Sequence, residues 1–206
     1  MAHPTYEIAK VVVSDEYLAD PTIADSISGA LTDTPGFLGG WKGLDVQEPQ
    51  YLWLVVAWES LEHHYALMKD KERYPAMIEV FQKLAKEVVF MHHVKFSSDL
   101  IEALAWPTTE VVLCTLKEST DRAEFEKTLQ KLLAQLEKDV PSSELAMGGW
   151  GPVIEDERKF MVSHGWHSLE RSHAAICGAT EFLACVTAIQ QLSVPEVRFV
   201  NLVKHT

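Results

Sequence analysis

The sequence predicts an α+β protein built from two tandem ferredoxin-like units, each with the element order β-α-β-β-α-β. The prediction depends on an internal repeat, because self-similarity at a fixed displacement indicates a structural unit that occurs twice. Three segments recur in the same order, displaced by 108 or 109 positions: Gly39-Gly40-Trp41 as Gly148-Gly149-Trp150, Trp58-Glu59-Ser60-Leu61-Glu62 as Trp166-His167-Ser168-Leu169-Glu170, and Phe90–Lys95 as Phe199–Lys204.

Local patterns predict the first strand and helix of each unit. Residues 6–13 and 110–116 are rich in β-branched side chains and predict strands. Asp20 followed by Pro21 is typical of a helix start, and apolar residues recur after it at helical spacing. In the second unit, Asp121 and Glu124 resemble a capping box in front of an apolar helical stripe.

Local patterns also predict the strands and the helix in the second half of each unit. One strand begins near each Gly-Gly-Trp, and the next ends at Trp58 or Trp166. Ser60 and Ser168 are placed to cap the following helix. That helix is expected to break at Tyr74-Pro75 in the first unit and at Gly178 in the second, and a final strand then closes each unit.

This element order predicts helices on one face of a four-stranded antiparallel sheet, with the other face left open. Two such sheets can bury their open faces against each other, so one chain is expected to form an intrachain α/β barrel. The expected domains are residues 1–96 and 109–206, joined by a docked linker over 97–108 that contains Pro107. We expect a monomer or a weak homodimer.

Composition excludes several classes of protein. The net charge of −12 argues against nucleic acid or an anionic membrane as a partner, because both require clustered Lys and Arg. There is no apolar stretch long enough for a membrane span and no signal-peptide pattern, so a cytoplasmic location is expected. The three cysteines form no C-x-x-C pair and are expected to be small buried hydrophobes.

The paired motifs Trp58-Glu59-Ser60 and Trp166-His167-Ser168 resemble the Trp-x-Ser at the end of the third strand in the dimeric α/β-barrel superfamily, in particular antibiotic biosynthesis monooxygenase-like proteins. The resemblance implies cofactor-independent monooxygenases, polyketide cyclases, isomerases, haem-degrading enzymes or stress-related proteins. The first strands lack the Asn of the haem-degrading branch, and Leu54 and Val162 stand where the monooxygenase branch has Asn.

Histidines are the main candidates for acid–base catalysis, because imidazole titrates near neutral pH. His92 and Asn201 occupy equivalent positions in the two predicted final strands, and His164 stands where the first unit has Val56. Either a ligand site or a local hydrogen bond explains His92, and either a specialised site or a drifted strand position explains His164.

The turns that follow the two Trp-x-Ser motifs supply further candidates. His64 and His173 lie there, where the related cyclases place a catalytic His, and Tyr65 adds a phenol. Trp58 and Trp166 are expected to be core residues or walls that stack on a flat substrate. No metal site is predicted, because His164 and His167, like His92 and His93, would point to opposite faces of a strand.

The leading hypothesis is an enzyme that needs no cofactor and binds a hydrophobic aromatic or polyketide-like molecule for oxygenation, cyclisation or isomerisation. Its proton-transfer candidates are His164, His173, His92 and His64, and its substrate-binding candidates are Trp166, Trp58, Asn201 and Tyr65. The alternative is a non-catalytic ligand-binding or stress-related protein. The enzyme hypothesis requires an enclosed apolar cavity of at least about 300 Å³ with two convergent polar groups. At most one functional pocket is expected, and the divergence of the repeats favours the second unit.

Overall fold

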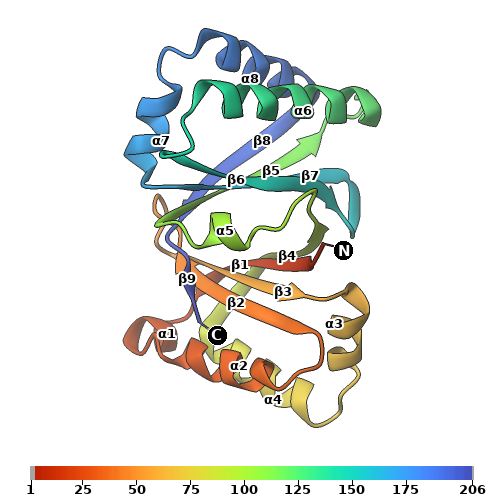
Figure 1. Cartoon of the computed structure of the whole chain (residues 1–206). Helices are drawn as coiled ribbons and strands as arrows, with labels where there is room; N and C mark the ends of the chain where they lie inside the picture. Colours follow the sequence, from red (N-terminus) through yellow and green to blue (C-terminus); the bar gives the residue numbers. More distant parts are fainter. Residues whose placement is uncertain (1–2, 206) are drawn as a thin grey trace. The chain divides into compact units, whose positions relative to one another are not determined.

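The computed structural model describes residues 3–205 and divides into two compact units, each built of β-strands and helices (Figure 1). Unit 1 comprises the chain up to Phe96 together with the segment that starts at Val200. Unit 2 comprises Ser97–Phe199.

Unit 1 has the predicted β-α-β-β-α-β order with two additions, a short helix after the first strand and a short strand near the C-terminus. Its sheet order is β4-β1-β3-β2-β9, and the pairs β1–β3, β1–β4, β2–β3 and β2–β9 are antiparallel. The elements are β1 (Thr5–Val13), α1 (Asp15–Ala19), α2 (Ile23–Thr32), β2 (Phe37–Leu44), β3 (Tyr51–Trp58), α3 (Leu61–Met68), α4 (Arg73–Leu84), β4 (Ala85–Lys95) and β9 (Val203–Lys204).

Unit 2 repeats this arrangement with the strand order β8-β5-β7-β6. The elements are α5 (Ile101–Leu104), β5 (Thr108–Leu116), α6 (Arg122–Asp139), β6 (Leu145–Val153), β7 (Asp156–Trp166), α7 (Leu169–Ile176), α8 (Thr180–Leu192) and β8 (Ser193–Val200). The prediction of two tandem ferredoxin-like units is confirmed.

In each unit the long helices pack on one face of the sheet. In unit 1, Val11 and Leu52 of the sheet pack with Leu84 of α4. In unit 2, Phe160 of β7 and Phe125 of α6 form one core, with ring centroids 4.9 Å apart. Strand side chains alternate between faces. The odd-numbered residues of β1 and the even-numbered residues of β7 therefore face the helices.

Several local predictions are confirmed. The Asp121 carboxylate accepts a hydrogen bond from the Glu124 amide (2.9 Å), and the Ser168 hydroxyl accepts one from the Arg171 amide (3.2 Å). Gly178 has φ +86°, a conformation that favours glycine, and it separates α7 from α8.

Two predicted helix boundaries in unit 1 were wrong. Asp20 does not begin a helix; it ends α1, and its carboxylate accepts a hydrogen bond from the Thr22 amide (3.0 Å). The predicted break at Tyr74-Pro75 lies earlier, between α3 and α4. Pro75 falls in the first turn of α4, where its missing N–H has no helical partner to lose.

The ends of the units differ from the expected ranges at two places. Segment 97–108 belongs to unit 2: the Ser97 amide donates to the Trp150 carbonyl (2.8 Å), and Leu100, Ala103 and Leu104 are buried. The expectation that residues 199–204 form part of one final strand was wrong, because β8 ends at Val200 and the separate strand β9 pairs with β2.

Among the described residues, no single helix is long and apolar enough to span a membrane. Only α7 and α8 together reach that length and apolarity, and they are bent by 106° at the break between them.

Candidate functional site in unit 2

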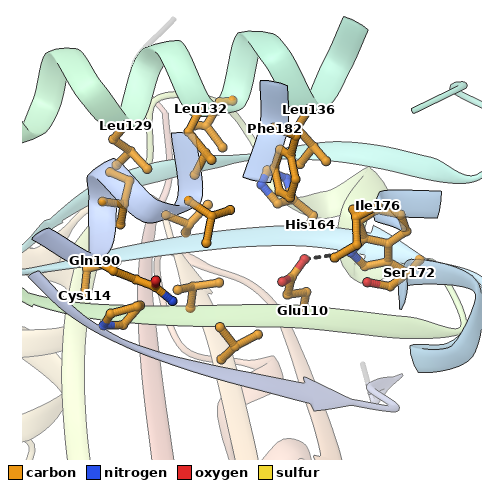
Figure 2. A pocket seen from close by; sticks show the side chains of 18 residues that line it. Glu110, Cys114, Leu129, Leu132, Leu136, His164, Ser172, Ile176, Phe182 and Gln190 are labelled. Atoms are coloured by element: carbon orange, nitrogen blue, oxygen red, sulfur yellow. Dashed lines mark hydrogen bonds between the residues drawn. The ribbon is translucent and has the colours of Figure 1, made fainter. Parts of the chain in front are cut away.

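A partly enclosed cavity of about 140 Å³ lies between the helices and the sheet of unit 2 (Figure 2). Strands β5, β7 and β8 form its floor, and side chains of α6, α7 and α8 cover it. Most of the lining is aliphatic or aromatic. The polar side chains in the lining are Glu110, Cys114, His164, Ser172 and Gln190.

Glu110 is the acidic group of this cavity. It lies on β5, and its Oε2 accepts a hydrogen bond from the indole Nε1 of Trp166 (2.8 Å; dashed in Figure 2). Burial raises the pKa of Glu110 from its ordinary 4.5 to about 7, although the Trp166 hydrogen bond acts in the opposite direction. The carboxyl group therefore exchanges a proton near neutral pH.

His164 is the imidazole of the same cavity. It lies directly opposite Glu110 in the β5–β7 pair, so the two Cβ atoms are about 5 Å apart on the same face. The Gly148 amide donates to Nδ1 (3.2 Å), which places the proton of the neutral ring on Nε2. His164 is 2% exposed, and its Nε2 has no hydrogen-bond partner among the described residues.

Burial also lowers the pKa of His164, from its ordinary 6.5 to about 4. At neutral pH the ring is therefore uncharged, and Nε2–H is a hydrogen-bond donor that a ligand can satisfy. A carboxyl group that titrates near pH 7 beside a neutral N–H donor is an arrangement suited to general acid–base chemistry.

The cavity is smaller than the 300 Å³ that the enzyme hypothesis was expected to require. A space of this size in an apolar core accepts a molecule of about one ring. Ile176 and Phe182 of the lining flank the break at Gly178, so a larger ligand would need the α7–α8 wall to move.

Two sequence-predicted residues, His164 and Trp166, meet in this cavity. His173, the candidate in the turn after the second Trp-x-Ser motif, is not among the residues that line the cavity. It is exposed, and its ring lies edge-on to Phe199 with centroids 6.0 Å apart. Its neighbour Ser172 is buried and lines the cavity instead.

His92 and Asn201, which were expected at equivalent positions, lie elsewhere in unit 1. His92 is on the sheet face away from the helices and stacks on Phe90, with ring centroids 4.7 Å apart. Asn201 is exposed in the break between β8 and β9, so the expected equivalence was wrong.

The remaining predicted residues surround a second polar cluster beneath the helices of unit 1. Trp58 Nε1 donates to Glu7 Oε2 (3.1 Å), as Trp166 does to Glu110, and the Trp58 ring stacks on His64 with centroids 5.2 Å apart. His64 Nδ1 lies 2.8 Å from His93 Nε2. Tyr65 is 43% exposed, with its ring centroid 6.3 Å from that of His64.

Sequence reasoning missed Glu110, Glu7, His93 and Ser172. One signal for the glutamates was available, because Glu7 and Glu110 occupy corresponding positions in the first strands of the two units. A charged side chain on the buried face of a strand indicates either a hydrogen-bonded structural group or a site.

The cysteines do not supply a nucleophile in the cavity. Burial raises the pKa of the Cys114 thiol to about 11, so it stays protonated at neutral pH. Cys114 and Cys185 are buried as expected. For Cys177 the expectation was wrong: it is exposed, because it lies at the break between α7 and α8.

Gly148 positions His164, and we expect Gly148→Ala to destabilise the protein by about 3 kcal/mol. A Cβ at this position would lie 2.0 Å from the Ser163 carbonyl oxygen, so β6 would have to move away from β7. Urea unfolding measures the change. Gly29→Ala is the control, because its Cβ meets nothing within 4 Å in α2; wild-type stability in Gly148→Ala would contradict the close approach.

Together the fold and the paired Glu–Trp contacts define a two-unit α/β protein whose fold is shared with solved structures. Solved structures with this fold cover nearly the whole chain.

Three of these structures illustrate the similarity. A protein provisionally assigned as a monooxygenase from Lactobacillus acidophilus matches with TM-score 0.66 and 10% identity, covering 98% of this chain and 94% of its own. A protein with the same provisional assignment from Fusobacterium nucleatum matches with TM-score 0.71 and 10% identity, covering 98% of this chain and 93% of its own. An anthrone oxidase-like protein matches with TM-score 0.68 and 10% identity, covering 97% of this chain and 91% of its own.

At these identities the similarity shows the fold alone. No known family profile and no curated protein sequence matches the chain.

Proposed function

We propose that unit 2 is an enzyme that needs no organic cofactor and removes a proton next to the carbonyl group of a small apolar ring compound. Oxygenation, cyclisation or isomerisation would follow from the resulting enolate. The observation that carries the proposal is the pair formed by Glu110 and His164, which face one apolar cavity from opposite positions on two strands.

The two groups have different roles. The Glu110 carboxylate takes the proton, since its pKa of about 7 matches a base that works near neutral pH. His164 Nε2–H donates a hydrogen bond to the carbonyl oxygen and stabilises the charge that develops there. The apolar lining strengthens both interactions because little water screens them.

The substrate class follows from the cavity. Its aliphatic and aromatic walls favour an uncharged ring, and its volume of about 140 Å³ favours a single ring or a larger flat molecule admitted by movement of α7 and α8. The monooxygenase and anthrone oxidase-like assignments of proteins with the same fold support oxygenation as a reaction of the enolate.

Deuterium exchange tests this proposal, because it detects proton removal whatever reaction follows. Cyclohexanone and anthrone are incubated with the protein in D₂O without O₂, and loss of the acidic C–H signal is followed by NMR. We expect the wild-type protein to accelerate exchange of at least one of these compounds. Oxygen consumption by the same mixture in air then separates oxygenation from isomerisation.

Leu133→Trp is the matched control, because it fills the cavity without removing a polar group. We expect it to abolish both exchange and binding of the probe while the protein stays folded. If the wild-type protein binds a ring compound and catalyses no exchange, unit 2 is a ligand-binding protein and the proposed enzyme activity fails.

A further inference from the structure

Three side chains with metal-binding atoms converge beneath the helices of unit 1. Glu7 on β1 and His93 on β4 lie directly opposite each other in an antiparallel pair, so their side chains rise from the same face. His64 on α3 lies 2.8 Å from His93 through Nδ1 and 3.5 Å from Glu7 Oε2 through Nε2. One donor atom from each residue lies within 4.8 Å of the others.

The donor types select a class of metal ion. Two imidazoles and one carboxylate suit Zn²⁺ and neighbouring first-row transition metals, whereas Mg²⁺ and Ca²⁺ prefer a set of oxygens. Three protein ligands also leave a fourth position for water or another ligand.

The surroundings hold these side chains in place. His64 and His93 are 5% and 6% exposed, and the ring of Trp58 stacks on His64 at an angle of 20°. The indole of Trp58 donates to Glu7 Oε2, an outer hydrogen bond of the kind that orients metal-binding carboxylates.

The nitrogen donors occur in unit 1 alone at these positions. Unit 2 keeps the Glu–Trp contact as Glu110 and Trp166, but Ser172 takes the place of His64 in the repeat, and β8, the last strand of unit 2, contains no histidine. The two units have therefore diverged at the same place in the fold, and the acid–base pair of unit 2 has no second imidazole of this kind.

We propose that unit 1 binds one divalent transition-metal ion, with Zn²⁺ as the best fit, through Glu7, His64 and His93. In the metal-free protein one imidazole donates an N–H to the other; on metal binding this proton moves to the second nitrogen of its own ring or to solvent, and the ion takes its place. Tetrahedral Zn²⁺ with bonds of about 2.0 Å requires the two nitrogens to be about 3.3 Å apart, so they separate by roughly half an ångström. The proposal concerns unit 1 alone and is independent of the function proposed for unit 2.

The test is titration of the metal-stripped protein with Zn²⁺ by calorimetry, in a Cys177→Ser background that removes the exposed thiol. We expect one strong site per chain and a rise in Tm of roughly 5 °C at a hundredfold excess over Kd. When Cu²⁺ is bound in place of Zn²⁺ to the same Cys177→Ser protein, the electron paramagnetic resonance spectrum should show splitting from two imidazole nitrogens.

His93→Ala and His92→Ala form a matched pair, because the two residues are adjacent on β4 and face opposite sides of the sheet. His93→Ala should lose the strong site and the Tm rise, whereas His92→Ala should keep both. The proposal is overturned if the background protein binds no ion tightly, if the Cu²⁺ spectrum shows no paired nitrogens, or if His93→Ala still binds like the background protein.

Discussion

Replacement of Glu110 by glutamine is expected to slow catalysed proton exchange by about two to four orders of magnitude. Glutamine keeps the size of the side chain and can still accept the Trp166 hydrogen bond through its amide oxygen, but it cannot take a proton. The wild-type rate should also rise with pH through about 7, as the Glu110 carboxyl group loses its proton. Glu110→Gln should lose this dependence.

Glu157→Gln is the control for this prediction. It removes an exposed carboxylate from β7 of the same unit, so its exchange rate should equal that of the wild-type protein. His164→Gln should lower the rate by about 10²- to 10³-fold, since it removes the donor for the carbonyl oxygen. An unchanged rate in Glu110→Gln would assign the base to another residue and remove the central step of the proposed mechanism.

The fold was predictable because each repeated motif marks a local feature. The paired Gly-Gly-Trp and Trp-x-Ser segments lie in strands or at strand ends, and the N-cap at Asp121 and the glycine at 178 act within a few residues. Local signals of this kind survive in one sequence. They account for the order of strands and helices in both units.

What could not be predicted depends on contacts between distant residues. The mostly apolar segment 199–204 fits one strand as well as two, and it is the pairing with β2 at Val203 and Lys204 that makes β9 a separate strand. The same applies to Trp166 and Glu110, which are 56 residues apart and meet only once β5 pairs with β7.

The site was partly predictable for the same reason. Strand alternation placed His164 and Trp166 on one face, which is correct, but it could not say that this face meets the helices. In the helix after Trp166, the resemblance to related cyclases favoured His173, whereas the helix turns Ser172 toward the sheet. Helical phase relative to a sheet is set by packing against the other elements of the unit.

The pH dependence of stability gives a second test of the cavity, independent of any substrate. The pKa of Glu110 is raised from 4.5 to about 7, so the unfolded chain releases this proton first and stability falls as pH rises across that range. The pKa of His164 is lowered from 6.5 to about 4, so the unfolded chain gains this proton first and stability falls as pH decreases from 6.5 toward 4.

The two contributions oppose each other between pH 4.5 and 6.5 and nearly cancel in the wild-type protein. Replacing either residue leaves only the contribution of the other to the pH dependence of stability. Relative to wild type, Glu110→Gln should gain about 3 kcal/mol of stability as pH rises from 4.5 to 7. His164→Gln should lose about 3 kcal/mol relative to wild type as pH rises from 4 to 6.5. Urea unfolding at half-unit pH steps measures both difference curves.

Opposite slopes are the decisive feature, because a general loss of packing shifts a difference curve up or down without tilting it. Burial alone lowers the pKa of His164, so Glu110→Gln should leave the histidine contribution in place. Glu157→Gln, with its exposed side chain, is the control for the carboxylate. Flat curves for both cavity variants would mean that water reaches Glu110 and His164 and keeps their pKa values near ordinary, which would also weaken their proposed catalytic roles.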